Sequence, residues 1–174
     1  AIIAMVVLYP AIDGVLLSFR EMRLTRPDLG TGFVGLRQYE DMVVDPTFRT
    51  ALVNTFLWVT LSCLLELFLG MISALALNRD TLLAKVLAVI VLLPWFLPNV
   101  VAANVWALIL DARLGVGNEV LMSLGILNQQ KAWFADPGTA LYAAIFVEAW
   151  HSYPFFTLLL LAGLKAVPQD LYKA

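Results

Sequence analysis

The residues best placed to do chemistry are three ionisable side chains that lie inside otherwise apolar stretches. Glu66 is the one acid of its stretch, while Glu148 and His151 share another at a spacing of three, which places them on one helix face. Ionisable groups in a membrane are costly and usually face a bundle interior or an aqueous cavity, so we predict a functional role for all three. The alternative is that the carboxylates only join helices. It suits Glu66 better, because Ser62 and Gly70 flank it at helical spacing.

Two short motifs fit known sites but lack the context that those sites need. Glu148 and His151 have the Glu-x-x-His spacing of di-iron bundles, which require a second such motif and two further carboxylates. The chain has one histidine in total. Residues 30–35 fit the dinucleotide fingerprint G-x-G-x-x-G, but no strand–turn–helix pattern surrounds them. We therefore predict no metal site and no nucleotide site in this chain, and Cys63, the one cysteine, cannot form an internal disulfide.

Four long apolar segments must position these side chains. Of the 174 residues, 61% are hydrophobic and 14% are charged, against about 25% charged in a typical soluble domain. The third segment carries no charge, and at ~1.5 Å per residue it would extend roughly 38 Å, enough to cross a ~30 Å hydrocarbon core. We predict an all-α fold, a polytopic membrane helical bundle with four transmembrane helices in this chain. The predicted spans are residues 1–19, 51–77, 86–110 and 138–164.

Prolines and polar residues mark the third span and the connection after it. Pro94 and Pro98 remove backbone donors four residues apart, so we predict a kink, either beside a transport pathway or as a static bend. In the connection, Asn118 is predicted to be the N-cap of a short helix, and Gly125 its stop.

The charges outside the spans restrict the partners but leave the orientation open. The net charge is −2 and no dense basic block exists, which argues against nucleic acid as a partner. Connections 20–49 and 111–137 share one side with seven Lys or Arg, whereas 78–85 and the end of the chain share the other side with four. A raw count places the first side in the cytoplasm, while the density of cations in 78–85 favours the reverse.

Several phrases, taken in order, resemble the maltose-type permeases of bacterial ABC carbohydrate importers. The resemblance lies in Tyr9-Pro10, in Phe33–Tyr39, in Asp45–Phe48, in Pro94, Pro98 and Trp106, and in Trp133–Pro137. The most specific stretch is 161–174, which is similar to the run that enters the family's Glu-Ala-Ala loop, the coupling helix that docks on the ATPase. Two departures are Gln38, where the family usually has Asn, and Lys173, where it usually has Glu.

This resemblance implies one transmembrane permease domain over 1–174, with the start of a coupling helix at 168–174. The family core has six spans, so we expect this sequence to be a fragment that lacks the extreme N-terminus and the last two spans. It implies that Lys165–Ala174 is cytoplasmic and that 20–49 is outside, in a multi-pass protein of the bacterial plasma (inner) membrane. The implied coupling residues are Leu171, Tyr172, Lys173 and Ala174. The candidates for the substrate pathway are Asn99, Asn104, Trp106, Glu148 and His151.

The resemblance also implies partners and a division of labour. The expected partners are the lipid bilayer, a second permease subunit, cytoplasmic ATP-binding subunits and an extracytoplasmic sugar-binding protein. This chain would be non-catalytic and would hold no cofactor, because ATP and Mg would bind the ATPase subunit. Two alternatives stay open at this point. A proton-coupled secondary transporter could use Glu66 or Glu148 as a relay, and a membrane-embedded glycosyltransferase would need clustered acids, whereas the acids here are scattered.

Overall fold

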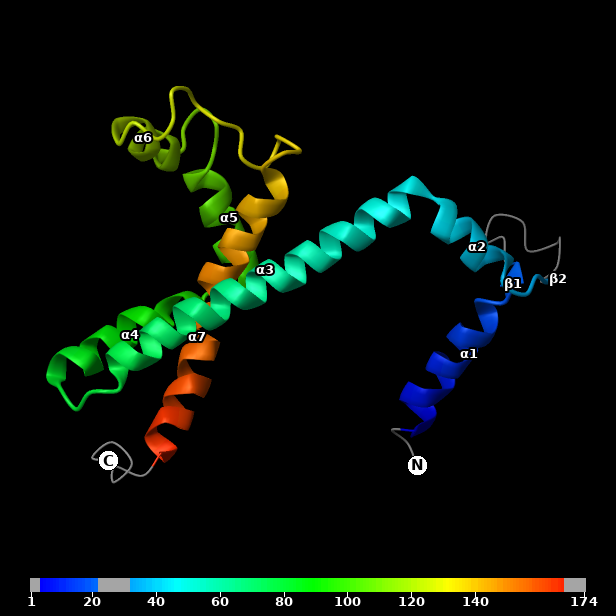
Figure 1. Ribbon diagram of the computed structural model, residues 1–174, viewed down its shortest axis with the longest axis horizontal. Helices are drawn as coiled ribbons and strands as arrows, with labels where there is room; N and C mark the ends of the chain where they lie inside the picture. Colours follow the sequence, from blue (N-terminus) through cyan, green and yellow to red (C-terminus); the bar gives the residue numbers. More distant parts are fainter. Residues whose placement is uncertain (1–3, 22–31, 168–174) are drawn as a thin grey trace. The chain divides into compact units, whose positions relative to one another are not determined.

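The computed structural model describes residues 4–21 and 32–167, and its regular secondary structure is helical apart from two strands of two residues each, which confirms the all-α class (Figure 1). The chain divides into two compact units, Ala1–Asn54 and Thr55–Ala174. In chain order, the elements are a π-helical turn Ala4–Leu8, α1 (Tyr9–Leu17), β1 (Arg20–Glu21), β2 (Gly32–Phe33), α2 (Arg37–Val44), α3 (Pro46–Leu77), α4 (Leu82–Phe96), α5 (Asn99–Ile109), α6 (Val116–Ser123) and α7 (Ala140–Ala166).

The first unit joins α1 to α2 through a two-stranded antiparallel ribbon. Arg20 lies opposite Phe33 in the register of β1 and β2. The hydroxyl oxygens of Ser18 and Tyr39 are 2.6 Å apart, which ties the end of α1 to α2. Gly35 has a φ of 59°, a left-handed conformation that glycine adopts without strain, and it turns the chain from β2 into α2. This glycine therefore serves a turn between a two-residue strand and a helix.

Two of the four predicted spans are single long helices. α3 has 32 residues and α7 has 27, and both are long and apolar enough to cross a membrane. α3 begins at Pro46 rather than at the predicted residue 51, because Asp45 Oδ1 accepts a hydrogen bond of 2.7 Å from the Thr47 amide and caps the helix start. Within the described residues, the first predicted span is represented by the shorter apolar stretch Met5–Leu17.

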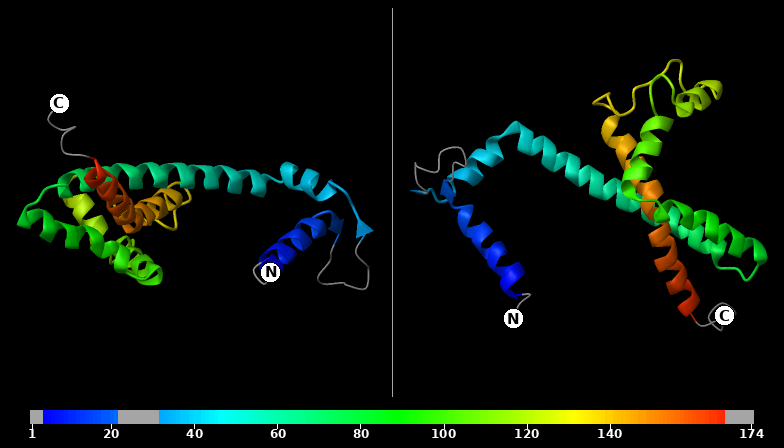
Figure 2. Two further views of the ribbon diagram at one scale, coloured as in Figure 1. Left: turned by 90° about the horizontal axis from the view of Figure 1, so that it is seen from below. Right: turned by 180° about the vertical axis from the view of Figure 1, so that it is seen from behind.

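The third predicted span, residues 86–110, is not one helix. The structure has α4 and α5 in its place, bent by 96° at a break of two residues, either a broken span or a re-entrant loop (Figure 2). Pro98 has no amide hydrogen, and it disfavours the helical conformation of the residue before it. Leu97 accordingly has an extended ψ of 136°. The predicted kink is therefore confirmed, while the single continuous helix is wrong.

The short helix in the following connection also differs from its prediction. α6 begins at Val116, and its N-cap is Gly115, so Asn118 lies inside the helix rather than at its start. A Cβ atom at residue 115 would lie 2.4 Å from the Asp111 carbonyl oxygen, so only glycine fits there. The predicted stop is confirmed, since Gly125 follows Leu124 with a φ of 72°.

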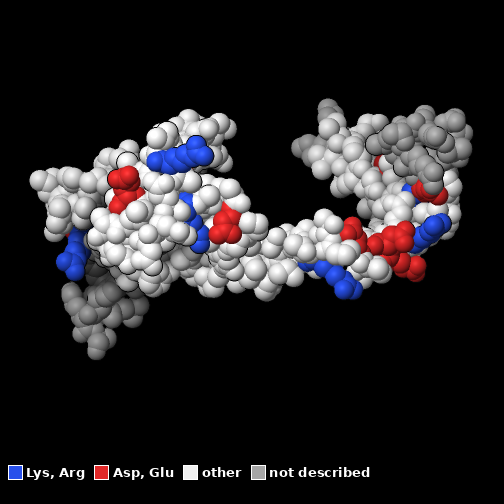
Figure 3. Space-filling model, turned by 90° about the horizontal axis from the view of Figure 1, so that it is seen from above, with Lys and Arg blue, Asp and Glu red and all other residues white. Residues whose placement is uncertain are grey.

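The core of the second unit is narrow, and it lies where α7 packs against its neighbours. α7 packs on α4 and α5. It also crosses α3 at Gly70, where an added Cβ atom would lie 2.7 Å from Phe156 Cβ. Most large apolar side chains outside these contacts are exposed, and the face of the molecule in Figure 3 is largely uncharged over this unit. Such a surface is suited to lipid or to apolar protein partners rather than to water.

Candidate functional site

The break between α4 and α5 exposes backbone groups at the middle of an apolar stretch. α4 is capped by Thr81, whose Oγ1 accepts a hydrogen bond of 3.2 Å from the Ala84 amide. The helix ends at Phe96, and the carbonyl of Pro94 accepts from the Leu97 amide at 3.2 Å. A new helix then begins after Pro98, whose carbonyl accepts from the amides of the first turn of α5. The break thus leaves the Leu97 carbonyl without a partner in its own helix, and irregular backbone of this kind needs a neighbour or a cavity in a membrane.

His151 of α7 supplies that neighbour. Its Nε2 atom lies 2.9 Å from the carbonyl oxygen of Leu97. A carbonyl oxygen can only accept, so Nε2 must carry the proton in this contact. One side chain of α7 therefore satisfies the backbone at the corner between α4 and α5.

Aromatic rings flank the break. The rings of Trp95 and Phe155 are 6.0 Å apart between centroids, and these side chains are 41% and 49% exposed. Phe155 is one helical turn beyond His151, so both lie on the face of α7 that meets the break. Partly exposed ring faces of this kind can stack on the C–H faces of a ligand.

Carboxylates lie beside the same face of α7. Glu148 Oε1 accepts a hydrogen bond of 2.9 Å from the Ser152 hydroxyl. Glu66 of α3 is buried, with 8% of its surface exposed, and its charge interacts with that of Glu148. In the part of the chain that the structure describes, Glu66 has no hydrogen-bonding partner. Glu66 of α3 and Glu148 of α7 therefore lie close enough for their carboxyl groups to interact electrostatically.

The structure distributes the predicted pathway residues over two places. Asn99, Glu148 and His151 lie at or beside the break, with Asn99 exposed on the first turn of α5. Asn104 is also exposed, but its amide donates to the Val100 carbonyl of its own helix at 2.7 Å. Trp106 lies among aromatic rings of α7, as described next. The sequence therefore identified three residues near the break and two further along α5.

A second aromatic cluster joins α5 to α7. The ring of Trp106 packs edge-on against Phe146 at 5.2 Å and against Trp150 at 5.3 Å. The buried Trp106 Nε1 has no hydrogen-bonding partner among the described residues. Ring contacts in this cluster therefore hold α5 against α7, and the indole N–H of Trp106 is available as a donor among the described residues.

Sequence reasoning missed two contributors to the site. They are the Leu97 carbonyl and Phe155. Phe155 lies four residues after His151, so extending the predicted helix face by one turn would have found it. The carbonyl could not be found in this way, because its availability depends on where the helix breaks.

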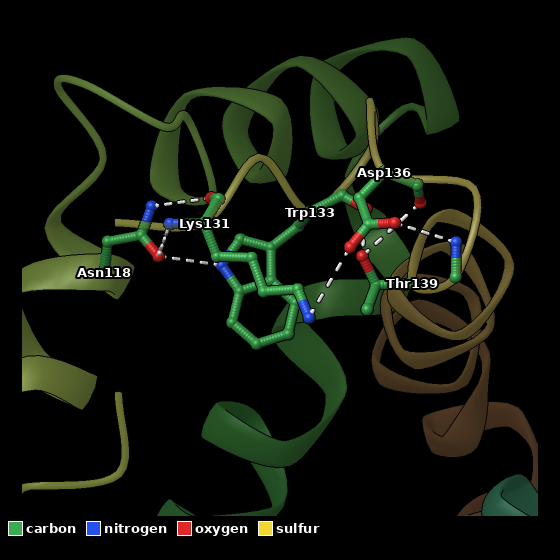
Figure 4. Close-up of polar contacts among 6 residues, drawn as sticks. Asn118, Lys131, Trp133, Asp136 and Thr139 are labelled. Carbon is green, nitrogen blue, oxygen red and sulfur yellow. Dashed lines mark hydrogen bonds and ion pairs between the residues drawn. The ribbon is translucent and has the colours of Figure 1, made fainter. Parts of the chain in front are cut away.

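The connection from α5 to α7 is built around one buried amide (Figure 4). Asn118 is 1% exposed, and its Nδ2 donates to the carbonyls of Asp111 and Lys131, both at 3.0 Å. Its Oδ1 accepts from Trp133 Nε1 at 2.9 Å and from the Lys131 amide at 3.4 Å. Farther along, Thr139 Oγ1 donates to the Trp133 carbonyl at 3.0 Å. We call Asn118, its three partners Asp111, Lys131 and Trp133, and Thr139 the Asn118 hub.

An exposed carboxylate orders the first turn of this connection. Asp111 Oδ1 accepts from the amides of Arg113 and Leu114, both at 2.8 Å. These bonds, with the nearby Arg113 charge, lower the pKa of Asp111 from its ordinary value. The turn is therefore best ordered when Asp111 is ionised.

Comparison with known proteins decides the family. The sequence model for the binding-protein-dependent transport system inner membrane component matches residues 66–174. The chain belongs to this family. The matched region contains α4, α5, α6 and α7, together with the part of α3 that carries Glu66, so the break and its neighbours lie within it.

Relatives of this inner membrane component include sugar permeases. The chain is 39% identical over 142 residues to the trehalose/maltose transport system permease protein MalF of Thermococcus litoralis, covering 82% of this chain and 48% of that protein. It is 31% identical over 173 residues to the sulfoquinovosyl glycerol transport system permease protein SmoG of Agrobacterium fabrum, covering 99% of this chain and 55% of that protein. The chain therefore spans about half the length of the curated relatives it matches.

A solved transporter shares the fold. The crystal structure of a bacterial ABC transporter involved in the import of the acidic polysaccharide alginate contains a chain that matches with a TM-score of 0.80 and 22% identity. The match covers 99% of this chain and 57% of that one. The resemblance to permeases of sugar importers, inferred from short phrases of sequence, is confirmed at the level of the family. The predicted coupling residues Leu171–Ala174 lie outside the described residues.

Proposed function

We propose that this chain is part of the transmembrane permease subunit of an ABC importer that moves a carbohydrate across the inner membrane. Its partners are a second permease subunit, cytoplasmic ATP-binding subunits and an extracytoplasmic sugar-binding protein. The chain itself breaks no bond, and ATP hydrolysis belongs to the ATP-binding subunits. Family membership and the sugar permeases among the relatives support this proposal.

The observation that carries the transport role is the broken helix beside the polar face of α7. A carbonyl outside a helix and two acids are costly within an apolar helical bundle, whereas a pathway for a polar cargo requires such groups. The carbonyl of Leu97, the carboxylate of Glu148 and the aromatic rings around them offer hydrogen bonds and stacking surfaces. Both kinds of contact suit a sugar, which has hydroxyl groups on its edges and C–H groups on its faces.

The proposal assigns roles to the predicted residues. Glu148, His151 and Asn99 line the cargo pathway at the break, while Asn104 and Trp106 line it further along α5. Leu171–Ala174 lies at the start of the segment that contacts the ATP-binding subunit. ATP-driven movement of that segment is transmitted to the spans, and the two access states of the pathway are populated in turn.

The test uses the complete protein with its partner subunits in proteoliposomes. We expect uptake of a neutral disaccharide such as maltose or trehalose to require ATP and to be unaffected by an uncoupler. Replacement of Leu171–Ala174 by a Gly-Ser segment of equal length should abolish sugar-stimulated ATPase activity while the subunits still assemble. Lys173→Glu, which installs the residue usual in the family, is the matched control and should retain coupling.

Three outcomes would contradict this function. Uptake that survives ATP depletion but is lost with an uncoupler would indicate a proton-coupled secondary transporter. Transfer of sugar to a lipid acceptor would indicate a glycosyltransferase. Normal coupling after replacement of Leu171–Ala174 would refute the docking role of that segment.

A further inference from the structure

The ionisable groups near the break are two acids and one imidazole. In the described part of the second unit, the helices α4, α5 and α7 and the α3 segment from residue 55 carry two cations, Lys85 and Lys165. Lys85 is in the first turn of α4 and Lys165 in the last turn of α7. At ~1.5 Å per residue, each lies roughly 20 Å along its helix from the break. Among these described helices, no fixed positive charge therefore lies beside the carboxylates at the break.

Hydrogen-bonding capacity on the α7 side of the break is also one-sided. Glu148 accepts one hydrogen bond from Ser152, which leaves most of the lone pairs of an ionised carboxylate available. His151 uses its Nε2 proton on the Leu97 carbonyl, so in the neutral ring the remaining Nδ1 atom is an acceptor. A ligand therefore meets chiefly acceptors on α7 and must supply the donors there, whereas the exposed amide of Asn99 on α5 can also donate to it.

The rings beside these acceptors define the rest of the ligand. Trp95 and Phe155 present partly exposed aromatic surface on α4 and α7. An aromatic face favours an apolar or positively polarised partner over an anion, because the centre of the ring carries the negative end of its quadrupole. The C–H face of an uncharged sugar ring fits that surface, and a carboxylate or sulfonate does not.

From this arrangement we infer that the cargo is an uncharged carbohydrate and that Glu148 selects against acidic sugars, an inference that rests on the proposed transport function. Two adjacent hydroxyl groups of a sugar can donate together to the two oxygens of one carboxylate. An acidic group on the sugar has no proton to donate, and it is repelled by a like charge. Ser152 holds Glu148 in position through the hydrogen bond of 2.9 Å.

The test compares matched sugars that differ only in one acidic group. One pair is glucosylglycerol and its 6-sulfonate, and the other is maltose and the analogue whose non-reducing glucose is replaced by glucuronate. Equilibrium binding of each radiolabelled sugar is measured on the complete transporter in nanodiscs, without the binding protein, whose own specificity would otherwise be measured. The wild type should bind the neutral member of each pair at least about tenfold more tightly, since a like charge in a partly buried site costs that much or more.

Substitution then assigns the selectivity to a residue. Glu148→Gln keeps the size and one acceptor of the side chain but removes the charge, and it should reduce the ratio of affinities to about threefold or less. Glu66→Gln should change the ratio less than Glu148→Gln does, because Glu66 is buried on α3. Glu119→Gln, at an exposed position on α6, is the matched control and should leave the ratio unchanged. The thermal stability of each complex is measured alongside, so that a folding defect is recognised.

The outcomes distinguish a failure of the inferred charge selectivity from a failure of the proposed transport function. Equal or tighter binding of the acidic sugars by the wild type, or an unchanged ratio in a stable Glu148→Gln complex, would overturn the inference while transport stands. If an assembled transporter neither binds nor takes up any sugar, the transport function falls and the inference falls with it.

Discussion

The Asn118 hub and the helix break are built in opposite ways from the same kinds of group. In the hub, the buried amide of Asn118 has both donors and its acceptor engaged, and the neighbouring residues Lys131 and Asp136 pair at 3.6 Å. At the break, the exposed Leu97 carbonyl has one contact, from His151, and the carboxylate of Glu66 has no hydrogen-bonding partner among the described residues. The first arrangement fixes a single conformation, because every alternative loses hydrogen bonds.

From this difference we expect the fully bonded polar residues to stabilise the structure and the partly bonded ones to be available for hydrogen bonds to a ligand. A fully satisfied group gains nothing from a ligand, since binding would first have to break existing bonds. A partly satisfied group at the edge of an exposed surface can form new bonds without that loss. Stability and activity should therefore respond to different substitutions in the two regions.

The largest effect on stability is expected in the hub. Asn118→Leu keeps the branched shape of the side chain but leaves the Trp133 indole N–H and the Lys131 carbonyl without their partner, while the Asp111 carbonyl keeps the Gly115 amide, so we expect a destabilisation of about 2–4 kcal/mol. The melting temperature of the assembled transporter measures it. Asn128→Leu makes the same chemical change at an exposed position and should have little effect. Equal melting temperatures for the two variants would show that the hub is not what orders this connection.

At the break, activity should fall while stability is nearly kept. His151→Ala removes the one contact of the Leu97 carbonyl, and we expect ATP-driven uptake to fall about tenfold, equivalent to ~1.4 kcal/mol in the barrier. The melting temperature should change by the equivalent of less than about 1 kcal/mol, the net value of a typical hydrogen bond. His151→Gln, which retains a donor, should recover part of the uptake. A loss of stability as large as that of Asn118→Leu would remove the distinction between the two regions.

A smaller effect is expected from Pro98→Ala, which restores a backbone donor at the break. The new amide can bond to the Pro94 carbonyl, so the 96° bend between α4 and α5 should decrease and uptake should fall by a few-fold. Spin labels at the exposed positions 83 and 108, in a Cys63→Ser background, would report the straightening as a longer distance between the labels. Pro154→Ala, inside the uninterrupted α7, is the control and should leave this distance unchanged.

The smallest effect concerns pH and the turn at Asp111. Its pKa is lowered in the folded chain, so its contribution is present above the ordinary carboxyl pKa of about 3.9 and is lost as the pH falls through the lowered value. The protection factors of the Arg113 and Leu114 amides, which are the intrinsic exchange rates divided by the observed rates at the same pH, should therefore be steady from neutral pH down to about that ordinary value and decrease only below it. Asp111→Asn should remove the acid-induced change. Lower protection factors already at mildly acidic pH would contradict the assignment.

The sequence predicted the parts of this fold that depend on composition and missed those that depend on backbone conformation. The spans that became α3 and α7 were found because a long stretch without charge has few alternatives to a membrane helix. The 96° angle at Pro98 could not be found, because a proline permits either a kink or a break, and the choice depends on a partner such as His151 from a distant part of the chain. Asn118 was predicted to be a helix cap by its residue type, whereas its true partners are up to fifteen residues away.

The crossing of α3 and α7 at Gly70 restricts which substitutions this protein can accept during evolution. A side chain at residue 70 would meet Phe156 Cβ at 2.7 Å, and also the Phe156 carbonyl carbon and the Thr157 amide nitrogen, each at 3.2 Å. Two of these three atoms belong to the backbone, which no mutation on α7 can shorten. A larger residue at position 70 thus has no compensating partner substitution, and only a shift of a whole helix could accommodate it. The rings of Trp95 and Phe155 contact each other through side chains alone, so this pair can be replaced together while the helix crossing stays unchanged.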